Sequence, residues 1–297
     1  MYENRNMSAR VIPDPAILRR EIEASHERCV RYAINPENRG SQNQKYLSPE
    51  ALSQRLADNR HFLDIAVAQI KELYQFVADA GWVVTITDGD GYILHILGAP
   101  HLLKERETGN CIPGYRWTEK DVGTSAISLS LARGIPVQIN DDEHFCVGGH
   151  GLSCSASPVF DPNGQILGII AMSGKIEKEH PHTLGMVITA ASSIENQLRI
   201  KKTANELQLK NNYMEAIIDS IDSGVMAVGR NGIINQVNRH GLHILQWVRF
   251  FFYHLSFSPL CLACFLIIFN VCHGQLGIFP GLPAAKGKSR YAVCQGF

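Results

Sequence analysis

The sequence predicts an α/β fold in which an antiparallel sheet is flanked by helices, with a helical lead-in before it and a long helix after it. Three observations predict this fold. Segments 82–97, 155–172 and 224–238 alternate apolar residues on both sides of Gly- or Asn-containing turns, as β-hairpins do. Apolar residues recur at helical spacing in the first eighty residues and again over 181–221. With 297 residues, the chain is long enough for one or two domains with apolar cores.

The composition excludes several classes of protein. Lys+Arg and Asp+Glu both number 28, so the chain as a whole lacks the basic charge that attracts nucleic acid. The N-terminus has no apolar stretch of the kind found in secretory signals. Eight cysteines in a chain of this length do not form a dense disulfide framework, so we expect a reducing, cytoplasmic environment.

The first eighty residues predict helices. Asp14 followed by Pro15 is a helix start, and the apolar spacing continues over 15–32. Ser48 before Pro49 predicts a second N-cap. From there the apolar spacing extends to about residue 80, with room for a break. Neither helix carries a chemical motif, which indicates packing and dimer contacts.

The first hairpin and its neighbours come next. Strands are expected over 82–87 and 92–97, joined by the turn Asp-Gly-Asp-Gly at 88–91. Residues 98–120 contain scattered Gly and Pro and predict a long, functional loop. A short helix is expected over 124–133.

The second half of the sheet follows. Residues 135–139 predict a strand, and Pro136 indicates either the start of the strand or a sheet edge. After a loop over 140–153, the hairpin 155–172 turns on Asp-Pro-Asn-Gly. The helical pattern over 181–221 is typical of a helix that pairs with a second copy of itself.

The stretch 114–174 mixes glycines, small polar residues and a few large side chains, which favours a folded pocket over a plain core. The helix that opens at Thr124 and Ser125 has N–H groups able to hold a small ligand, although either residue also serves as an ordinary N-cap. Trp117 would roof the pocket or fill the core.

His144, Cys146, His150 and Cys154 are residue types that bind zinc or iron, but their spacing matches no common structural finger. A Cys146/Cys154 thiol switch is an alternative. Glu143 beside His144 suggests an acid/base pair, but no recognisable nucleophile or second carboxylate accompanies it. We therefore predict no metal, no cofactor and no enzymatic activity.

Several motifs in this stretch occur in an order that resembles a known family. They are Gly114 with Trp117-Thr-Glu119, Gly123-Thr-Ser-Ala126, Pro136-Val, Glu143-His-Phe145, Cys154-Ser-Ala-Ser-Pro158, Asp161-Pro-Asn-Gly164 and Ser173-Gly174. Together they resemble the GAF domain of sigma-54-dependent transcriptional activators of the acetoin/dihydroxyacetone regulator kind. The hairpin from Gly224 resembles the start of a PAS domain.

The resemblance implies five segments: a helical lead-in (1–60), a GAF sensory domain (61–199), a linking signalling helix (200–222), the start of a PAS domain (223–246) and an apolar tail unlike the family (247–297). The candidate ligand-binding residues are Trp117, Thr124, Ser125, Glu143, His144, Cys154 and Ser155. The expected partners are a small-molecule effector or a regulatory protein, and a second copy of the chain.

The family pattern stops before the end of the sequence. Family members continue into an ATPase and a helix-turn-helix, but no Walker loop of the form G-x-x-x-x-G-K-[ST] occurs here. We therefore expect DNA and sigma-54 polymerase to be contacted only through domains missing from this sequence. No Asp or Glu follows Asp222, and eight of the twelve Phe follow Trp247. A frameshift near Trp247 is our hypothesis for this tail, and resequencing the coding DNA tests it.

Three other classes remain open. One alternative is that the chain is the sensory part of another signalling protein, such as a sensor kinase. However, His180 and His182 precede the long helix and are not set, as a phosphoacceptor histidine is, on a dimer helix followed by an ATP-binding domain. It would be a thiol or redox protein of the GAF fold, which requires reactive cysteines. A membrane anchor over 255–271 is disfavoured, because Pro259 and polar residues interrupt the apolar run.

Overall fold

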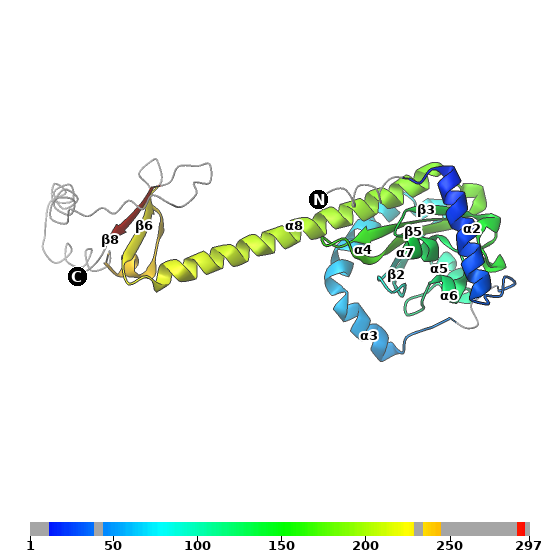
Figure 1. The fold of residues 1–297 in the computed structure, drawn as a ribbon, viewed down its shortest axis with the longest axis horizontal. Coiled ribbons are helices and arrows are strands. Elements are labelled where there is room, and N and C mark those ends of the chain that lie inside the picture. Colours follow the sequence, from blue (N-terminus) through cyan, green and yellow to red (C-terminus); the bar gives the residue numbers. More distant parts are fainter. Residues whose placement is uncertain (1–11, 39–43, 229–233, 245–289, 295–297) are drawn as a thin grey trace, which may run out of the picture. The chain divides into compact units, whose positions relative to one another are not determined.

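The computed structural model describes residues 12–38, 44–228, 234–244 and 290–294. These residues fall into two compact units, Met1–Lys202 and Thr203–Phe297, which we describe separately. The first unit carries the expected antiparallel sheet flanked by helices (Figure 1). The second carries a small sheet.

The first unit is built on a five-stranded antiparallel sheet in the order β2-β1-β5-β4-β3. The strands are β1 (Val83–Thr87), β2 (Ile93–Leu97), β3 (Val137–Asn140), β4 (Leu152–Phe160) and β5 (Ile166–Lys175). The two predicted hairpins therefore form, and they join through β1 and β5. Strand β3 begins directly after Pro136 and lies at a sheet edge, so both positions that this proline indicated are found, because a residue without an N–H interrupts a ladder.

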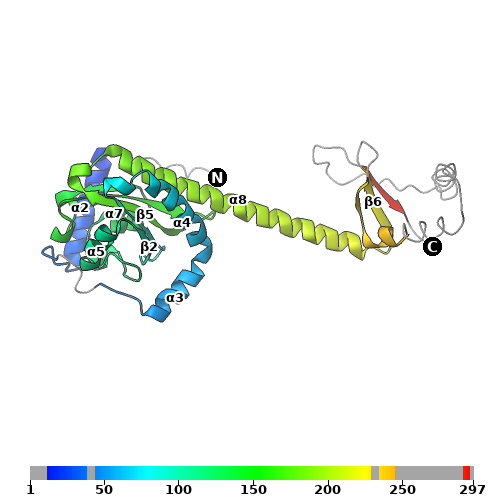
Figure 2. The ribbon, with the colours of Figure 1, turned by 180° about the vertical axis from the view of Figure 1, so that it is seen from behind.

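Two helices cover one face of this sheet, which we call the packed face. They are α4 (Arg60–Gln75) and the first part of α8 (Pro181–Ser220), and they lie side by side in Figure 2. The core here consists of large side chains from both layers, including Phe62, Ile70, Ile86, Ile170, Met172, Val187 and Ile194. Their burial stabilises the unit by about 1.5–3 kcal/mol for each side chain.

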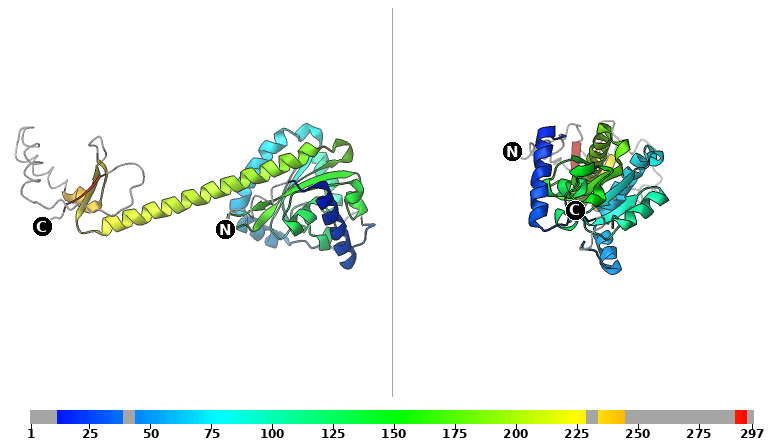
Figure 3. Two further views of the ribbon diagram at one scale, coloured as in Figure 1. Left: turned by 45° about the horizontal axis from the view of Figure 1, so that its top comes forward. Right: turned by 90° about the vertical axis from the view of Figure 1, so that its right-hand side faces the viewer.

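The opposite face, which we call the cavity face, is covered by shorter elements. Helix α7 (Ala126–Arg133) packs on β3, β4 and β5, and α2 (Pro15–Arg31) packs on α7 and α6 (Glu119–Val122). In the right-hand view of Figure 3, α2 and α4 flank the strands from opposite sides. The buried side chains on this face are smaller on average: Ile22, Ala126, Ile127, Leu129, Val137, Ile139, Cys154, Ala156, Ile169 and Ala171.

The predicted helix starts at Asp14 and Ser48 are confirmed. Asp14 Oδ1 accepts a hydrogen bond from the N–H of Ala16 at 2.8 Å, and Ser48 Oγ accepts one from Ala51 at 3.2 Å. The second helix breaks at Asn59 into α3 (Pro49–Asp58) and α4. A short 3₁₀ helix, η1 (Ala78–Ala80), ends this region before Gly81 adopts the left-handed conformation.

The expectation of a long loop over 98–120 is wrong. Residues Pro100–Thr108 form helix α5, and α6 follows at Glu119. The proline that suggested a loop stands at the start of α5, where its missing N–H costs no intrahelical hydrogen bond. The loop over 140–153 also contains two short 3₁₀ helices, η2 (Asp141–Glu143) and η3 (Val147–Gly149), before β4 begins at Leu152. Another 3₁₀ helix, η4 (Ile176–Lys178), follows β5.

The second unit holds a three-stranded sheet in the order β7-β6-β8. Its strands are β6 (Gly224–Val228), β7 (Ile234–Val237) and β8 (Arg290–Cys294). The predicted hairpin β6–β7 is present, although its Asn-Gly turn lies outside the described residues. Asn238 fixes its base, because its amide oxygen accepts from the N–H groups of Val225 and Gly241 at 2.8 Å.

Most of the predicted apolar tail, including the 255–271 segment, also lies outside the described residues, but 290–294 pair with β6 as β8. No helix in the described part of the chain is long and apolar enough to cross a membrane.

Candidate functional site

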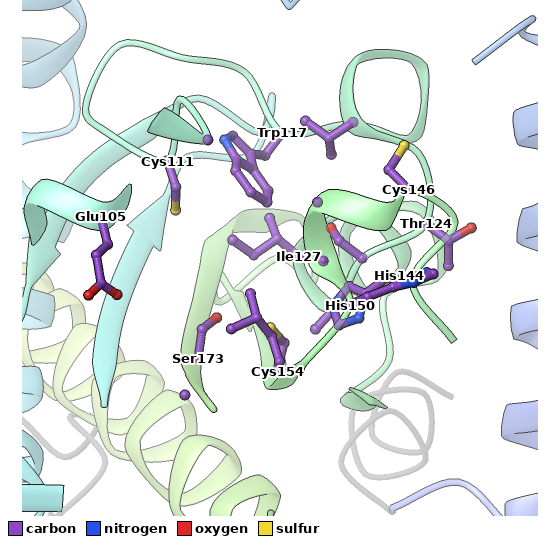
Figure 4. Close-up of a pocket in the computed structure, with 18 of the residues that line it drawn as sticks. Glu105, Cys111, Trp117, Thr124, Ile127, His144, Cys146, His150, Cys154 and Ser173 are labelled. Atoms are coloured by element: carbon purple, nitrogen blue, oxygen red, sulfur yellow. The ribbon is translucent and has the colours of Figure 1, made fainter. Parts of the chain in front are cut away.

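A cavity of about 290 Å³ opens on the cavity face, beside the start of α7 (Figure 4). Trp117, Ile127 and Leu152 supply apolar wall. Thr124, His144, Cys154 and Ser173 supply polar or polarisable atoms, and most of the lining comes from segments far apart in the sequence. The sheet contributes the start of β4, with Leu152 and Cys154, and the end of β5, with Ser173 to Lys175.

The structure brings together five of the seven predicted site residues. Trp117, Thr124, Ser125, His144 and Cys154 all line the cavity. Glu143 and Ser155 are not among the lining residues.

Strand geometry explains the position of Ser155. Side chains alternate between the two faces of a strand. Cys154 faces the cavity, so Ser155 points to the packed face, where its register partner Met172 lies in the core. Ser155 Oγ is buried there without a hydrogen-bond partner among the described residues.

The carboxylate of Glu143 is hydrogen-bonded to the local backbone. Its Oε2 accepts a hydrogen bond from the N–H of Asn140 at 2.7 Å, and this bond closes a capping box around η2. A carboxylate used in this way fixes the shape of the loop.

Ser125 caps α7. Its Oγ accepts from the N–H of Ser128 at 3.2 Å, and the N–H of Ser125 donates to Ser128 Oγ at 2.9 Å. This reciprocal pair satisfies two of the N–H groups that a helix start leaves open. Ser125 therefore shapes the cavity wall primarily as a helix cap.

Thr124 belongs both to the cavity wall and to a buried polar network that holds α2. Its Oγ1 lies 2.8 Å from Ser25 Oγ, and Ser25 donates to Glu119 Oε1 at 2.6 Å. Arg28 donates to both oxygens of Glu119, at 2.6 and 2.7 Å. The Glu119 carboxylate, which is 6% exposed, is thus satisfied by α2.

Trp117 lies at the upper side of the cavity in Figure 4, next to Ile127. Its indole N–H donates to the carbonyl of Asn110 at 3.2 Å, and its ring also packs against the core of the cavity face. Trp117 therefore lines the cavity and also packs against the core, which are the two roles considered for it from the sequence.

His144 is the most buried titratable group of the site. Its Nδ1 lies 3.1 Å from the carbonyl oxygen of Asp141, and Cys154 is a close neighbour of its side chain. Burial lowers the pKa of His144, but Cys154, the Asp141 carbonyl and Glu143 outweigh it, so that the pKa is raised. The ring packs against Gly149, where a Cβ would come within 2.6 Å of it.

The other thiols of the site are in a different environment. Burial, and to a smaller degree the neighbouring Cys29, raise the pKa of Cys146 to about 11. Burial also raises the pKa of Cys29, whose sulfur lies 3.4 Å from Thr124 Oγ1. The described residues contain no group of three or more His, Cys, Asp or Glu able to hold a metal ion.

Several lining residues were not predicted, among them Leu102, Glu105, Ser173 and Lys175. Ser173 had no local signal in the sequence, because counting from the pair Phe160↔Ile166 would place residue 172 opposite Cys154, and the register shift between Val159 and Phe160 brings Ser173 there instead. Leu102 and Glu105 belong to α5, the helix that the sequence analysis did not predict.

Comparison with known proteins assigns this region to a family. Residues 55–196 match the model of the family described as MimR, N-terminal domain. This stretch of the chain is therefore similar to the N-terminal domain of MimR. The domain holds all five strands of the large sheet, together with most of the cavity.

Curated relatives are transcriptional regulators. The chain is 34% identical over 225 residues to a signal-transduction and transcriptional-control protein of Clostridium beijerinckii, with 76% of this chain and 35% of the relative covered. It is 31% identical over 208 residues to the acetoin dehydrogenase operon transcriptional activator AcoR of Bacillus subtilis, with 70% and 34% covered. The chain therefore spans about a third of the length of these relatives.

A solved structure shares the fold. The DhaR(N) structure from E. coli, solved as a complex with DhaL, superposes with a TM-score of 0.77 at 19% identity. The match covers 93% of this chain and 99% of that one. The mixed α/β fold predicted from the sequence is thereby confirmed.

Proposed function

We propose that the MimR-type domain is a GAF-type sensor that binds a small polar metabolite in the cavity and controls sigma-54-dependent transcription. The observation that carries this proposal is the cavity itself, because it lies inside the domain shared with transcriptional regulators and collects polar groups on an apolar wall. The sensor has no catalytic role of its own in this proposal.

The size and lining of the cavity limit the ligand. A volume of about 290 Å³ is at the lower end of the range for ligand sites, roughly 300–1,000 Å³. A molecule of three or four carbons with hydroxyl or carbonyl oxygens fits both the space and the hydrogen-bonding groups. Relatives are named for acetoin, dihydroxyacetone and glycerol operons, and these compounds are the first ligands to test.

Thermal unfolding of the whole chain tests this function. At a hundredfold excess over its Kd, a ligand adds about 2.7 kcal/mol of stability, enough to raise the Tm by several degrees. We expect acetoin, dihydroxyacetone or glycerol to produce such a shift. Ser173→Leu, which fills the cavity, should remove the shift, whereas Ser53→Leu on the exposed face of α3 should keep it. The same shift in wild type and Ser173→Leu would place the ligand elsewhere.

A regulatory protein is the second candidate signal. The solved structure of the same fold contains a DhaR(N)–DhaL complex, and Phe76 at the end of α4 is 82% exposed on this chain. An aromatic side chain with this exposure is typical of a protein contact. Co-elution with a DhaL-type protein in size-exclusion chromatography, lost in Phe76→Ser, would favour this candidate.

We propose that α8 joins two copies of the chain. Ile200, Leu207 and Met214 are exposed at intervals of seven residues, and Ile221 continues the series just after the helix ends. A stripe of this period on a helix is buried by pairing with another helix of the same period. Sedimentation velocity of the whole chain measures this association.

The remaining parts of the family architecture are also proposals. We assign 61–199 to the sensor, 200–222 to a signalling helix and 223–246 to the start of a PAS domain. In the structure, α8 runs without a break across residue 200 and as far as Ser220. We assign contacts with DNA and sigma-54 polymerase to regions other than the MimR-type domain, and a role in transcription implies the cytoplasm. Limited proteolysis of the whole chain tests the boundaries, because cleavage should concentrate between these segments.

A further inference from the structure

We infer that Cys154 and His144 form a thiol–imidazole pair that captures a small carbonyl compound in the cavity as a reversible hemithioketal. The inference rests on the proposed function and names the chemical class of its ligand. Both residues line the same cavity, and both are buried, with 5% of His144 and 8% of Cys154 exposed (Figure 4).

The hydrogen bonds of His144 determine which ring nitrogen meets the thiol. The Asp141 oxygen that lies 3.1 Å from Nδ1 is a carbonyl, so it can only accept, and Nδ1 must carry the proton. In the neutral ring Nε2 is then an acceptor, and Cys154, a close neighbour of the imidazole, is the thiol that could donate to it. A nucleophile, a base and a third group that orients the base are the components of an activated thiol.

The loop around His144 holds this arrangement in place. Asp141 has a φ of +43°, in the left-handed region, and its Oδ1 accepts from the N–H of Gly151 at 2.7 Å. Gly149 packs directly on the imidazole, so any side chain at that position would displace the ring. A non-glycine residue with positive φ costs energy, and such strain tends to persist where the surroundings fix a functional geometry.

A second cysteine in the cavity wall, Cys146, has different surroundings from Cys154. Cys146 lines the same space, but burial raises its pKa to about 11, and its sulfur lies 3.6 Å from the carbonyl of Asn35 rather than beside a base. At pH 7 roughly one Cys146 thiol in ten thousand is ionised. The two cysteines therefore differ in the group beside the sulfur, an imidazole for Cys154 and a carbonyl for Cys146, and Cys146 serves as an internal reference.

The proposed step balances without another reactant. The sulfur of Cys154 forms a bond to the carbonyl carbon, and the π pair of the C=O bond moves to oxygen. The thiol proton passes to Nε2 of His144 and from there to that oxygen, which becomes a hydroxyl. Nothing is oxidised or reduced, and the reverse sequence releases the ligand. Ser173, the register partner of Cys154, lines the cavity beside it with a further hydroxyl.

The first test needs no ligand. The whole chain is treated with iodoacetamide at pH 7, and the modified peptides are followed by mass spectrometry. We expect Cys154 to react at least about tenfold faster than Cys146, even though a thiolate of higher pKa is intrinsically the better nucleophile. Equal or slower reaction of Cys154 would overturn the pair, whatever the protein binds.

Two variants distinguish activation of the Cys154 thiol by His144 from simple access of iodoacetamide to that thiol. His144→Asn removes the base, and Gly149→Ala keeps the imidazole but pushes it from its position. Both should slow Cys154 by about tenfold relative to Cys146 in the same sample. Circular dichroism identifies any variant that has not folded. If one of the two variants is unfolded, the Cys154 rate in the other variant tests the role of His144. An unchanged Cys154 rate in a folded variant would contradict the role of His144.

The second test uses acetoin labelled with carbon-13 at its carbonyl. Binding to the whole chain should produce a tetrahedral carbon signal in the NMR spectrum, retained in Ser53→Leu on the exposed face of α3 and lost in Cys154→Ala. A thermal shift with acetoin but no tetrahedral signal would overturn covalent capture and leave the proposed function standing. An activated Cys154 with neither signal nor shift for any of the three metabolites would overturn both.

Discussion

The two faces of the central sheet are built from the same strands but carry different side chains. On the packed face, Ile86, Ile170 and Met172 are fully buried under the long helices α4 and α8. On the cavity face, the neighbouring residues of β4 and β5 include Cys154, Ala156 and Ala171, beneath the short helix α7. Side chains fill the packed face, whereas the cavity face contains the cavity.

This difference shows how an alternating sequence encodes both stability and a site. Interiors pack at the density of organic crystals, so large side chains on every other residue leave no space between sheet and helices. On the intervening residues the buried side chains are smaller on average, and a cavity remains beside the start of α7, where Cys154 and Ser173 form part of its wall. The sensor domain therefore derives its rigidity from one face and its cavity from the other.

The largest expected effect separates the two faces directly. Ile194→Ala removes a fully buried side chain from the packed face and should cost about 2–5 kcal/mol of unfolding free energy. Ile127→Ala borders the cavity, where the lost methyl groups already face open space, so it should cost less than about 2 kcal/mol. Urea denaturation measures both. Equal costs would mean that the cavity is collapsed in solution.

A smaller effect is expected where α2 meets the cavity face. Glu119→Gln keeps the shape of the side chain but removes the charge that binds Arg28 and Ser25, which should cost about 1–3 kcal/mol. Glu21→Gln is the matched control, because Glu21 lies on α2, the helix that carries Arg28 and Ser25, and pairs with Arg133, which is 47% exposed. The control should cost less than about 1 kcal/mol. Chemical denaturation that gave the two variants equal stability would contradict a structural role for the buried network.

The smallest expected effect on folding concerns the exposed part of α8. Leu207→Lys should change the unfolding free energy by less than about 0.5 kcal/mol at fixed association state, since the side chain is exposed. It should nevertheless shift the chain toward monomer in sedimentation velocity. Leu209→Lys, equally exposed but outside the seven-residue series, should leave association unchanged. If both variants dissociate the chain into monomers, then the added charge, and not the seven-residue series of apolar side chains, controls association.

Much of the fold follows from local patterns. The helix starts at Asp14 and Ser48 and the paired strands of both large hairpins depend on neighbouring residues only, so they could be predicted. Helix α5 was missed because its flanking glycines and Pro100 resemble a loop, although a proline also suits a helix start. The packing of α2 on the cavity face involves residues about ninety positions apart and has no local signal.

The candidate site was predictable to a similar degree. Motif positions placed Thr124, His144 and Cys154 together, and the structure brings all three to one cavity. The alternation of β4 turns Ser155 away, a distinction that a motif cannot make but the period of a strand can. The contact between Gly149 and the imidazole became visible only in three dimensions.

The network that joins α2 to Glu119 and Thr124 bears on where the sensor begins. The family match starts at residue 55, yet Ile22 belongs to the buried core and the N–H of Val147 donates to the carbonyl of Pro36. A shortened chain that began at residue 55 would uncover this apolar patch and leave the Glu119 carboxylate without its cation. We therefore expect the smallest autonomously folding piece to be larger than the stretch 55–196 that the family model matches, because α2 forms an integral wall of the domain.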